Sequence, residues 1–181
     1  MKTIFGLILA VAAIQFTVPA SAATTDAKDI YKAANDKAAS DYKLARKQCD
    51  SITGNAKDVC VAQAKAAKVE SESYATAEYK GTPAARVSAS NDIADANYDV
   101  DKTKCESQNG NPKDVCIKQA QATMVAAKAN ATANKKIGEA QADANDDKQA
   151  ANYKVAMQKC DALAGSSKDN CVTSVKSQFG K

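Results

Sequence analysis

The sequence predicts an all-α fold: three disulfide-bonded antiparallel helical hairpins in tandem, joined by long alanine-rich helices. Three observations predict it. All six cysteines lie in three copies of one stretch, with a period of 56 and then 55 residues from Cys49 to Cys105 to Cys160. Each copy has a glycine midway between its two cysteines. The remainder is rich in alanine, lysine and glutamine, which favour helix.

Residues 1–22 have the pattern of a signal peptide. Lys2 gives a positive start, Ile4 to Val18 form an apolar core, and Ala20-Ser21-Ala22 is a cleavage site of small residues. The apolar run is short for a membrane anchor, and no stop-transfer pattern follows it. We therefore expect cleavage to leave residues 23–181, without a membrane span, in an oxidising compartment.

The two cysteines of each copy have ten residues between them. On one unbroken helix they would lie about 16 Å apart, whereas a disulfide needs Cα atoms roughly 4.4–6.8 Å apart. A helical turn at the glycine resolves this conflict, because the cysteines then face each other across an antiparallel hairpin. The expected disulfides are Cys49–Cys60, Cys105–Cys116 and Cys160–Cys171.

Residues around the glycine support a turn between two helices. The glycine can end one helix in a left-handed cap. An asparagine or serine follows it as the expected N-cap of the next helix, and an aspartate three residues further on places negative charge at that N-terminus. These residues are Gly54, Asn55 and Asp58; Gly110, Asn111 and Asp114; and Gly165, Ser166 and Asp169.

The helix boundaries follow from these signals. Thr82 is the expected N-cap, and Pro83 the first residue, of a helix that follows the break at Gly81. Between Pro112 and Cys160 two alternatives stay open: a break at Gly138 or at residues 145–147, or one very long helix. The expected helices cover residues 26–52, 55–80, 83–108, 112–160 with or without a break, and 166–178. The repeats then span residues 23–80, 81–137 and 138–181. Because large aliphatic residues are sparse, we expect the hairpins to share little core.

Each copy also repeats a tyrosine, an acid and a lysine at fixed positions. The tyrosine lies seven residues before the first cysteine, the acid directly follows that cysteine, and the lysine lies across the turn. One interpretation is a tyrosine packed on the partner helix and a surface ion pair worth at most about 1 kcal/mol. The other is a repeated binding patch. Its members are Tyr42, Asp50 and Lys57; Tyr98, Glu106 and Lys113; and Tyr153, Asp161 and Lys168.

The composition lacks the groups that most catalytic and metal sites need. The chain has no histidine, which removes histidine-based acid–base catalysis and histidine metal sites. It has no C-x-x-C motif and no glycine-rich phosphate loop. The charges are interspersed, with a net charge of +4 that falls to +3 when Lys2 is removed with the signal peptide. We expect no enzyme activity, no cofactor, no metal and no nucleic-acid partner.

The repeated motif, Tyr-x6-Cys-(Asp/Glu)-x3-Gly-(Asn/Ser)-x-Lys-Asp-x-Cys, resembles a group of small exported Ala/Lys-rich cysteine-hairpin proteins of Gram-negative bacteria. Some of these carry the label of the cell-envelope protein TolA, although the chain shows neither the retained anchor nor the C-terminal globular domain of TolA. The resemblance covers nearly the whole chain after the signal peptide. It implies a periplasmic or envelope location and supplies no functional residues.

The sequence therefore favours a non-enzymatic periplasmic protein with a structural or binding role in the cell envelope, with envelope proteins as its candidate partners. The alternative is a periplasmic chaperone or stress-response protein that holds unfolded clients in grooves between helices. The sequence does not indicate an oligomeric state.

Overall fold

The structure, a computed structural model, describes residues 26–181. The expected signal peptide, residues 1–22, lies outside the described residues. In the described range every regular element is a helix, so the predicted all-α class is confirmed. The elements are α1 (Ala27–Gln48), the 3-10 helix η1 (Cys49–Ser51), α2 (Gly54–Lys80), α3 (Pro83–Cys105), α4 (Asn111–Cys160) and α5 (Gly165–Gln178).

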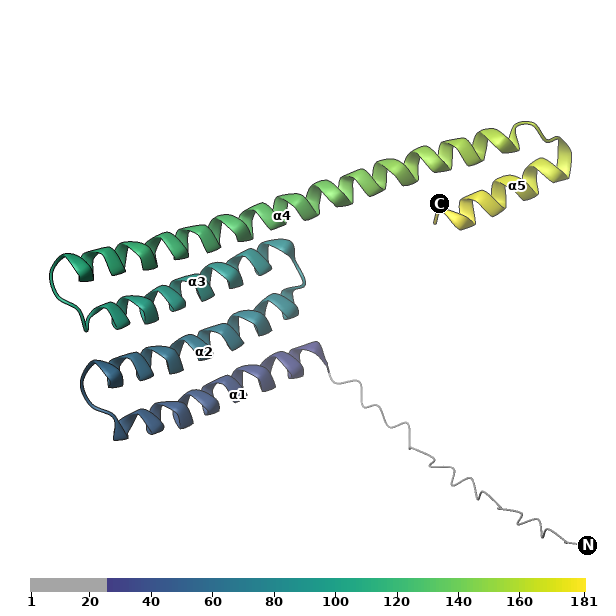
Figure 1. The fold of residues 1–181 in the computed structure, drawn as a ribbon. Helices are drawn as coiled ribbons and strands as arrows, with labels where there is room; N and C mark the ends of the chain where they lie inside the picture. Colours follow the sequence, from purple (N-terminus) through teal and green to yellow (C-terminus); the bar gives the residue numbers. More distant parts are fainter. Residues whose placement is uncertain (1–25) are drawn as a thin grey trace, which may run out of the picture.

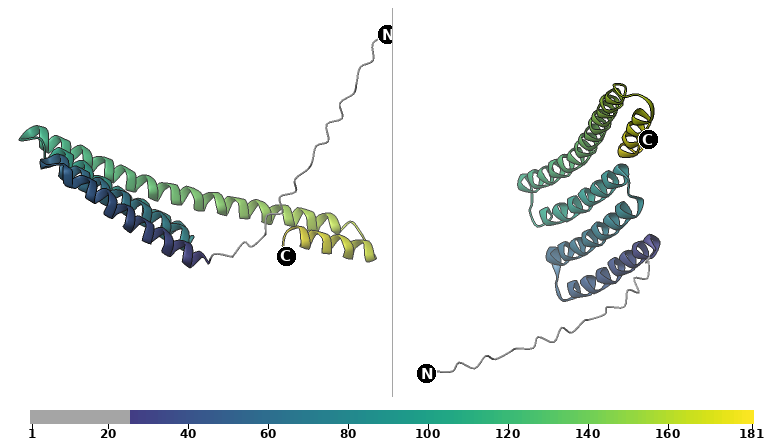
Figure 2. Two further views of the ribbon diagram at one scale, coloured as in Figure 1. Left: turned by 90° about the horizontal axis from the view of Figure 1, so that it is seen from below. Right: turned by 90° about the vertical axis from the view of Figure 1, so that its right-hand side faces the viewer.

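The helices form a single layer. α1, α2, α3 and the first half of α4 lie side by side, each antiparallel to its neighbour (Figures 1 and 2). The second half of α4 extends beyond this layer, and α5 folds back along it on the same side of α4 as α3 (Figure 1). Hairpin 1 is α1 with α2, hairpin 2 is α3 with the first half of α4, and hairpin 3 is the second half of α4 with α5.

The three expected disulfides are all present. The Cα atoms are 5.7 Å apart in Cys49–Cys60, 5.7 Å in Cys105–Cys116 and 5.6 Å in Cys160–Cys171. The first cysteine of each pair is almost completely buried. The turn after it begins with the same hydrogen bond in each copy, from the N–H three residues on to the cysteine carbonyl. The bonds are Ile52 to Cys49 (3.1 Å), Gln108 to Cys105 (3.0 Å) and Leu163 to Cys160 (3.1 Å).

The observed helix ends differ from the expected ones at these turns. The first helix ends at Gln48 and the third at Cys105, rather than at Ile52 and Gln108, because the chain tightens into i to i+3 bonds at the cysteine. The turn glycines do have positive φ, between 55° and 63°. The expected N-caps are wrong, however. The next helix begins a residue early, and no side chain caps it in any of the three copies.

The connection between hairpins 1 and 2 follows the sequence signals. Gly81 has φ 63°, and its N–H donates to the Ala77 carbonyl at 2.9 Å. The Thr82 hydroxyl accepts a hydrogen bond from the Ala85 N–H at 3.1 Å, and Pro83 begins α3. This turn therefore combines a left-handed glycine, a capping side chain and a proline, each of which disfavours a continuous helix.

The corresponding connection between hairpins 2 and 3 is not a turn. α4 is one helix of 50 residues, so of the two alternatives the very long helix is the one observed. Gly138 and residues 145–147 lie inside it, and the boundary expected between residues 137 and 138 falls within it. Its length is about 75 Å at 1.5 Å per residue. A single glycine costs a helix only about 1 kcal/mol, and Gly138 has neither a capping residue nor a proline after it.

Small side chains form most of the interior. The buried residues are chiefly alanines, and they occur on both faces of α3. Contacts between α2 and α3 are as extensive as those within hairpins 1 and 2. The expectation that the hairpins share little core is thus wrong for hairpins 1 and 2. Alanine contributes little volume, but it lets neighbouring helices approach closely along their whole length.

Candidate functional site

The repeated acid and lysine form an ion pair across the turn in every copy. Lys57 Nζ lies 3.5 Å from Asp50 Oδ1, and Lys168 Nζ lies 2.9 Å from Asp161 Oδ1. Lys113 and Glu106 form the third pair. All these side chains are substantially exposed, so solvent screens the pairs and each contributes at most about 1 kcal/mol.

The repeated tyrosines lie away from these ion pairs. Each is eight residues before the acid of its copy, which places it about 12 Å along the helix axis. Lys68 Nζ lies 5.8 Å from the centre of the Tyr42 ring, and the Tyr153 ring meets Phe179 edge-on at 5.7 Å. Tyr98 is half-buried on α3. Two of the tyrosines thus contact the partner helix, and the structure does not bring tyrosine and ion pair into one compact site.

Hairpins 1 and 2 are joined at their turn ends by two polar contacts. The Asn55 amide donates to the Thr103 backbone carbonyl at 2.7 Å. Lys65 Nζ lies 3.8 Å from Asp99 Oδ2. An open groove of about 340 Å³ lies between α2 and α3 here, and charged side chains line it together with alanines. Its lining includes Asp58, Lys65, Asp99, Lys102 and Glu106.

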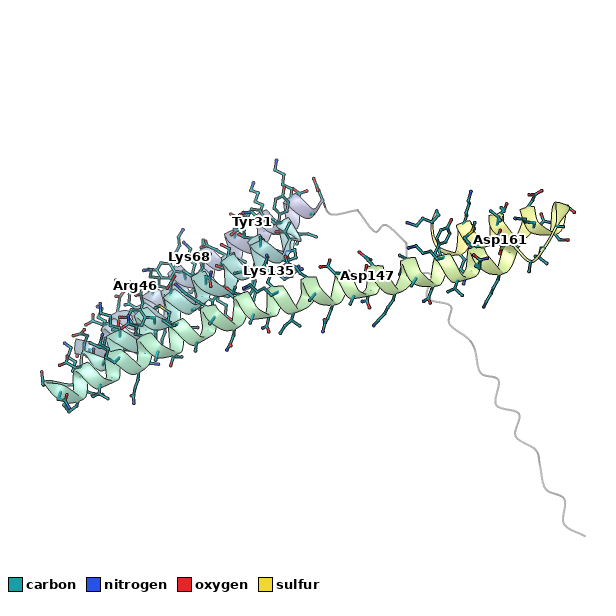
Figure 3. The ribbon with its side chains drawn as sticks, turned by 90° about the horizontal axis from the view of Figure 1, so that it is seen from above. Tyr31, Arg46, Lys68, Lys135, Asp147 and Asp161 are labelled. Carbon is teal, nitrogen blue, oxygen red and sulfur yellow. A yellow bond between two sulfur atoms is a disulfide. The ribbon has the colours of Figure 1, made fainter. Side chains whose placement is uncertain are left out.

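An exposed aromatic patch lies at the opposite end of hairpin 1. The rings of Tyr31 and Tyr79 stack with centroids 4.9 Å apart, and Figure 3 labels Tyr31 near the start of α1. Ile30, beside them, is 58% exposed. We call these three residues, together with the other residues that line the groove, the aromatic patch: Ala27, Ala34, Ala75 and Glu78.

Sequence reasoning missed this patch, although a signal for it exists. In an antiparallel hairpin, residues equally far from the turn face each other. Tyr31 lies 18 residues before Cys49, and Tyr79 lies 19 residues after Cys60. The same rule applies to hairpin 3, where Tyr153 lies seven residues before Cys160 and Phe179 lies eight residues after Cys171. The disulfide pairing therefore predicts both aromatic contacts.

Within residues 26–181, no group of three or more histidine, cysteine or acidic side chains is arranged to hold a metal ion. No helix in this range is both long enough and apolar enough to span a bilayer.

Comparisons with protein-family models, with curated proteins and with solved structures found no match. Function has therefore to be inferred from the helical layer, its turns and the aromatic patch.

Proposed function

We propose that the protein is exported to the periplasm and has a non-enzymatic structural or binding role in the cell envelope. The observation that carries this proposal is α4, a helix of 50 residues with a disulfide-closed turn at each end. Such a helix holds two ends of a molecule apart at a fixed distance, as a spacer or scaffold does. The resemblance to small exported cysteine-hairpin proteins, some with the TolA label, supports the same location.

The cysteines support the proposed compartment. All six form disulfides, which is typical of an oxidising, extracytoplasmic environment. The apolar segment and small-residue cleavage site in residues 4–22 support export through a cleavable signal. A fusion to a reporter that is active only outside the cytoplasm should be active, and the mature chain should begin at Ala23. A stable product that begins at Met1 in the membrane fraction would contradict export.

The binding role can be tested by photo-cross-linking in cells. A cross-linking residue at Lys113 tests the repeated patch, and one at Tyr79 tests the aromatic patch. Ser71 is the control, because it is exposed on α2 and belongs to neither patch. We expect Lys113 or Tyr79, but not Ser71, to give a specific adduct with an envelope protein. If neither position gives an adduct above the Ser71 background, the binding role is wrong.

One observation favours the alternative, a chaperone for unfolded clients. The aromatic patch exposes Ile30 and Tyr79 in a groove between α1 and α2, and the half-buried Tyr31 stacks on Tyr79. Exposed apolar surface of this kind suits unfolded chains. A client-aggregation assay separates the two proposals. A chaperone would suppress aggregation, and Ile30→Asp would abolish the suppression, while Lys32→Asp on another face of α1 would not. A scaffold would leave aggregation unchanged.

A further inference from the structure

α4 has an open side along its whole length. Both α3 and α5 lie on one side of it, and no helix of residues 26–181 covers the other (Figure 1). Figure 3 is seen from that open side, with α4 in front of the other helices and Asp147 on its extended half. The internal repeat shows what kind of surface this open side is.

The first half of α4 corresponds to α2. Counted from Cys60 and Cys116, four residues of α2 on the side that faces α3 have their equivalents 56 positions later on α4. The pairs are Ala66 and Ala122, Val69 and Val125, Ser73 and Ala129, and Thr76 and Thr132. All four residues on α4 are exposed, and Val125 is 55% exposed. The first half of α4 therefore has the same kind of surface that α2 uses to pack against α3, but no helix of the described residues covers it.

The second half of α4 corresponds to α3. Four residues of α3 that line the grooves towards α2, and the buried Val100 one turn further on, have equivalents of the same residue type 55 positions later. The pairs are Ala85 and Ala140, Ala89 and Ala144, Asp92 and Asp147, Ala96 and Ala151, and Val100 and Val155. Val100 is 6% exposed, whereas Val155 is 56% exposed. The second half of α4 therefore has the same kind of surface that α3 uses to pack against α2, and it too is exposed.

Both surfaces lie on the same side of α4. Ala133 and Lys136, which are also exposed, lie between the two surfaces, and with them the positions recur at spacings of three, four and four residues, close to the helical period. They therefore form one continuous stripe, with Thr132 at its edge. We call it the α4 stripe: Ala122, Val125, Ala129, Ala133, Lys136, Ala140, Ala144, Asp147, Ala151 and Val155. Because α4 continues as one helix through Gly138, its two halves extend away from each other along one axis, and their surfaces cannot meet within one chain.

We propose that the α4 stripe is the interface between two copies of this chain, with their α4 helices antiparallel. The second half of each α4 then covers the first half of the other, as α3 covers α2 within one chain. The α2–α3 packing occurs twice, about a two-fold axis close to Gly138, which gives a closed dimer. On each side of the axis, the helical layer of one copy ends with the first half of its α4. The second half of α4 of the other copy lies next in the layer, followed by α5 of that other copy.

The repeat also predicts a polar contact in this interface. Within one chain the Asn55 amide donates to the Thr103 carbonyl at 2.7 Å. Asn111 is the equivalent of Asn55, five residues before the second cysteine, and Gln158 is the equivalent of Thr103, two residues before the next one. The Asn111 amide should therefore donate to the Gln158 carbonyl of the other copy. The Lys65–Asp99 ion pair has no equivalent in this interface, because the corresponding residues are Gln121 and Lys154, which cannot form an ion pair.

The local sequence explains why the chain pairs with a copy rather than folding back on itself. The Gly81-Thr82-Pro83 turn lets α3 return along α2. The equivalent residues in the next repeat are Lys136-Ile137-Gly138, 55 positions later, which retain neither the capping threonine nor the proline. The connection stays helical, and the docking surface is presented to another molecule. This is the arrangement of a domain-swapped dimer.

The first test measures the molar mass of the oxidised chain, without the expected signal peptide, by light scattering over a range of concentrations. We expect the mass of a dimer. Ala151→Glu places a charge on the stripe, where the second half of one α4 meets the first half of the other, and should reduce the mass to that of a monomer. Ala150→Glu is the matched control. Ala150 is also exposed, lies about 100° around the helix, and has an acidic equivalent on α3, Asp95. This control should remain dimeric.

The second test restores the turn. The combined change Lys136→Gly, Ile137→Thr and Gly138→Pro copies the α2–α3 connection, so the two halves of α4 can meet within one chain. We expect a monomer with the same three disulfides and nearly unchanged helical circular dichroism. The proposal is overturned if the unaltered chain is monomeric at every concentration, if its dimer survives Ala151→Glu, or if the restored turn leaves it dimeric.

Discussion

Asn55 has a role that its place in the sequence does not indicate. It follows the turn glycine, where an N-cap is expected, yet its amide crosses to the Thr103 carbonyl of hairpin 2. The left-handed Gly54 already begins α2, so Asn55 lies inside the helix and its side chain is free to reach α3. A residue that resembles a local cap thus joins two repeats through a hydrogen bond between residues 48 positions apart.

We expect Asn55→Ala to lower the free energy of unfolding of hairpins 1 and 2 by about 1 kcal/mol, the usual contribution of one hydrogen bond. Chemical denaturation followed by circular dichroism measures this change. Ser71→Ala is the control, since the Ser71 hydroxyl bonds only to Ala67 of its own helix at an exposed site. If both variants unfold like the unaltered chain, the Asn55 bond contributes nothing to docking.

Gly81 and Gly138 occupy corresponding regions of two repeats but differ in backbone conformation. Gly81 ends α2 with a left-handed φ of 63°, whereas Gly138 has an ordinary helical conformation inside α4. A Cβ added at either position would meet no side chain or backbone of another part of the chain within 4 Å. Backbone conformation alone therefore separates the two sites, and the same substitution should have opposite effects on them.

Gly138→Ala should stabilise α4 locally by roughly 0.5–1 kcal/mol, because alanine has the higher helix propensity. Gly81→Ala should destabilise the α2–α3 turn by roughly 1–2 kcal/mol, because L-residues are strained in the left-handed region. Amide hydrogen exchange should become slower around residues 134–142 in the first variant and faster around residues 77–86 in the second. Equal effects in the two variants would mean that α4 also bends at Gly138.

At the scale of the whole molecule, stability is unevenly distributed. Hairpins 1 and 2 pack on each other through α2 and α3, whereas α5 packs only on α4. A helix of 14 residues is too short to be stable alone in water. The Cys160–Cys171 disulfide and the Tyr153–Phe179 contact therefore hold hairpin 3 together.

Replacement of Cys160 and Cys171 together by serine should release α5. The chain-entropy estimate for so short a disulfide loop is about 3 kcal/mol, so amide protection across residues 165–178 should be lost while α1, α2 and α3 keep theirs. The matched pair of changes, Cys49→Ser with Cys60→Ser, should weaken α1 less, because α1 packs on α2 over its whole length. Simultaneous loss of protection in all helices would show that the molecule unfolds as one unit.

The sequence predicts the local structure better than the packing between repeats. The ten-residue spacing with its central glycine is enough to predict Cys49–Cys60, and counting from that bridge predicts Tyr31 opposite Tyr79. The docking of α2 on α3 has no comparable signal, because alanine at Ala77 or Ala85 is as compatible with solvent as with a neighbouring helix. The sequence also leaves open whether α4 continues through Gly138, since one glycine changes the free energy of a helix by only about 1 kcal/mol.

The hairpin connectivity has a consequence for how the chain acquires its covalent structure. Six cysteines allow 15 pairings, and the native pairing joins each cysteine to its partner only eleven positions away. Loops this short close in less than a microsecond, far faster than sulfur chemistry proceeds. Each native bridge therefore needs only two consecutive cysteines of the sequence. Oxidation of the reduced chain should yield the native bridges directly, without rearrangement by an isomerase.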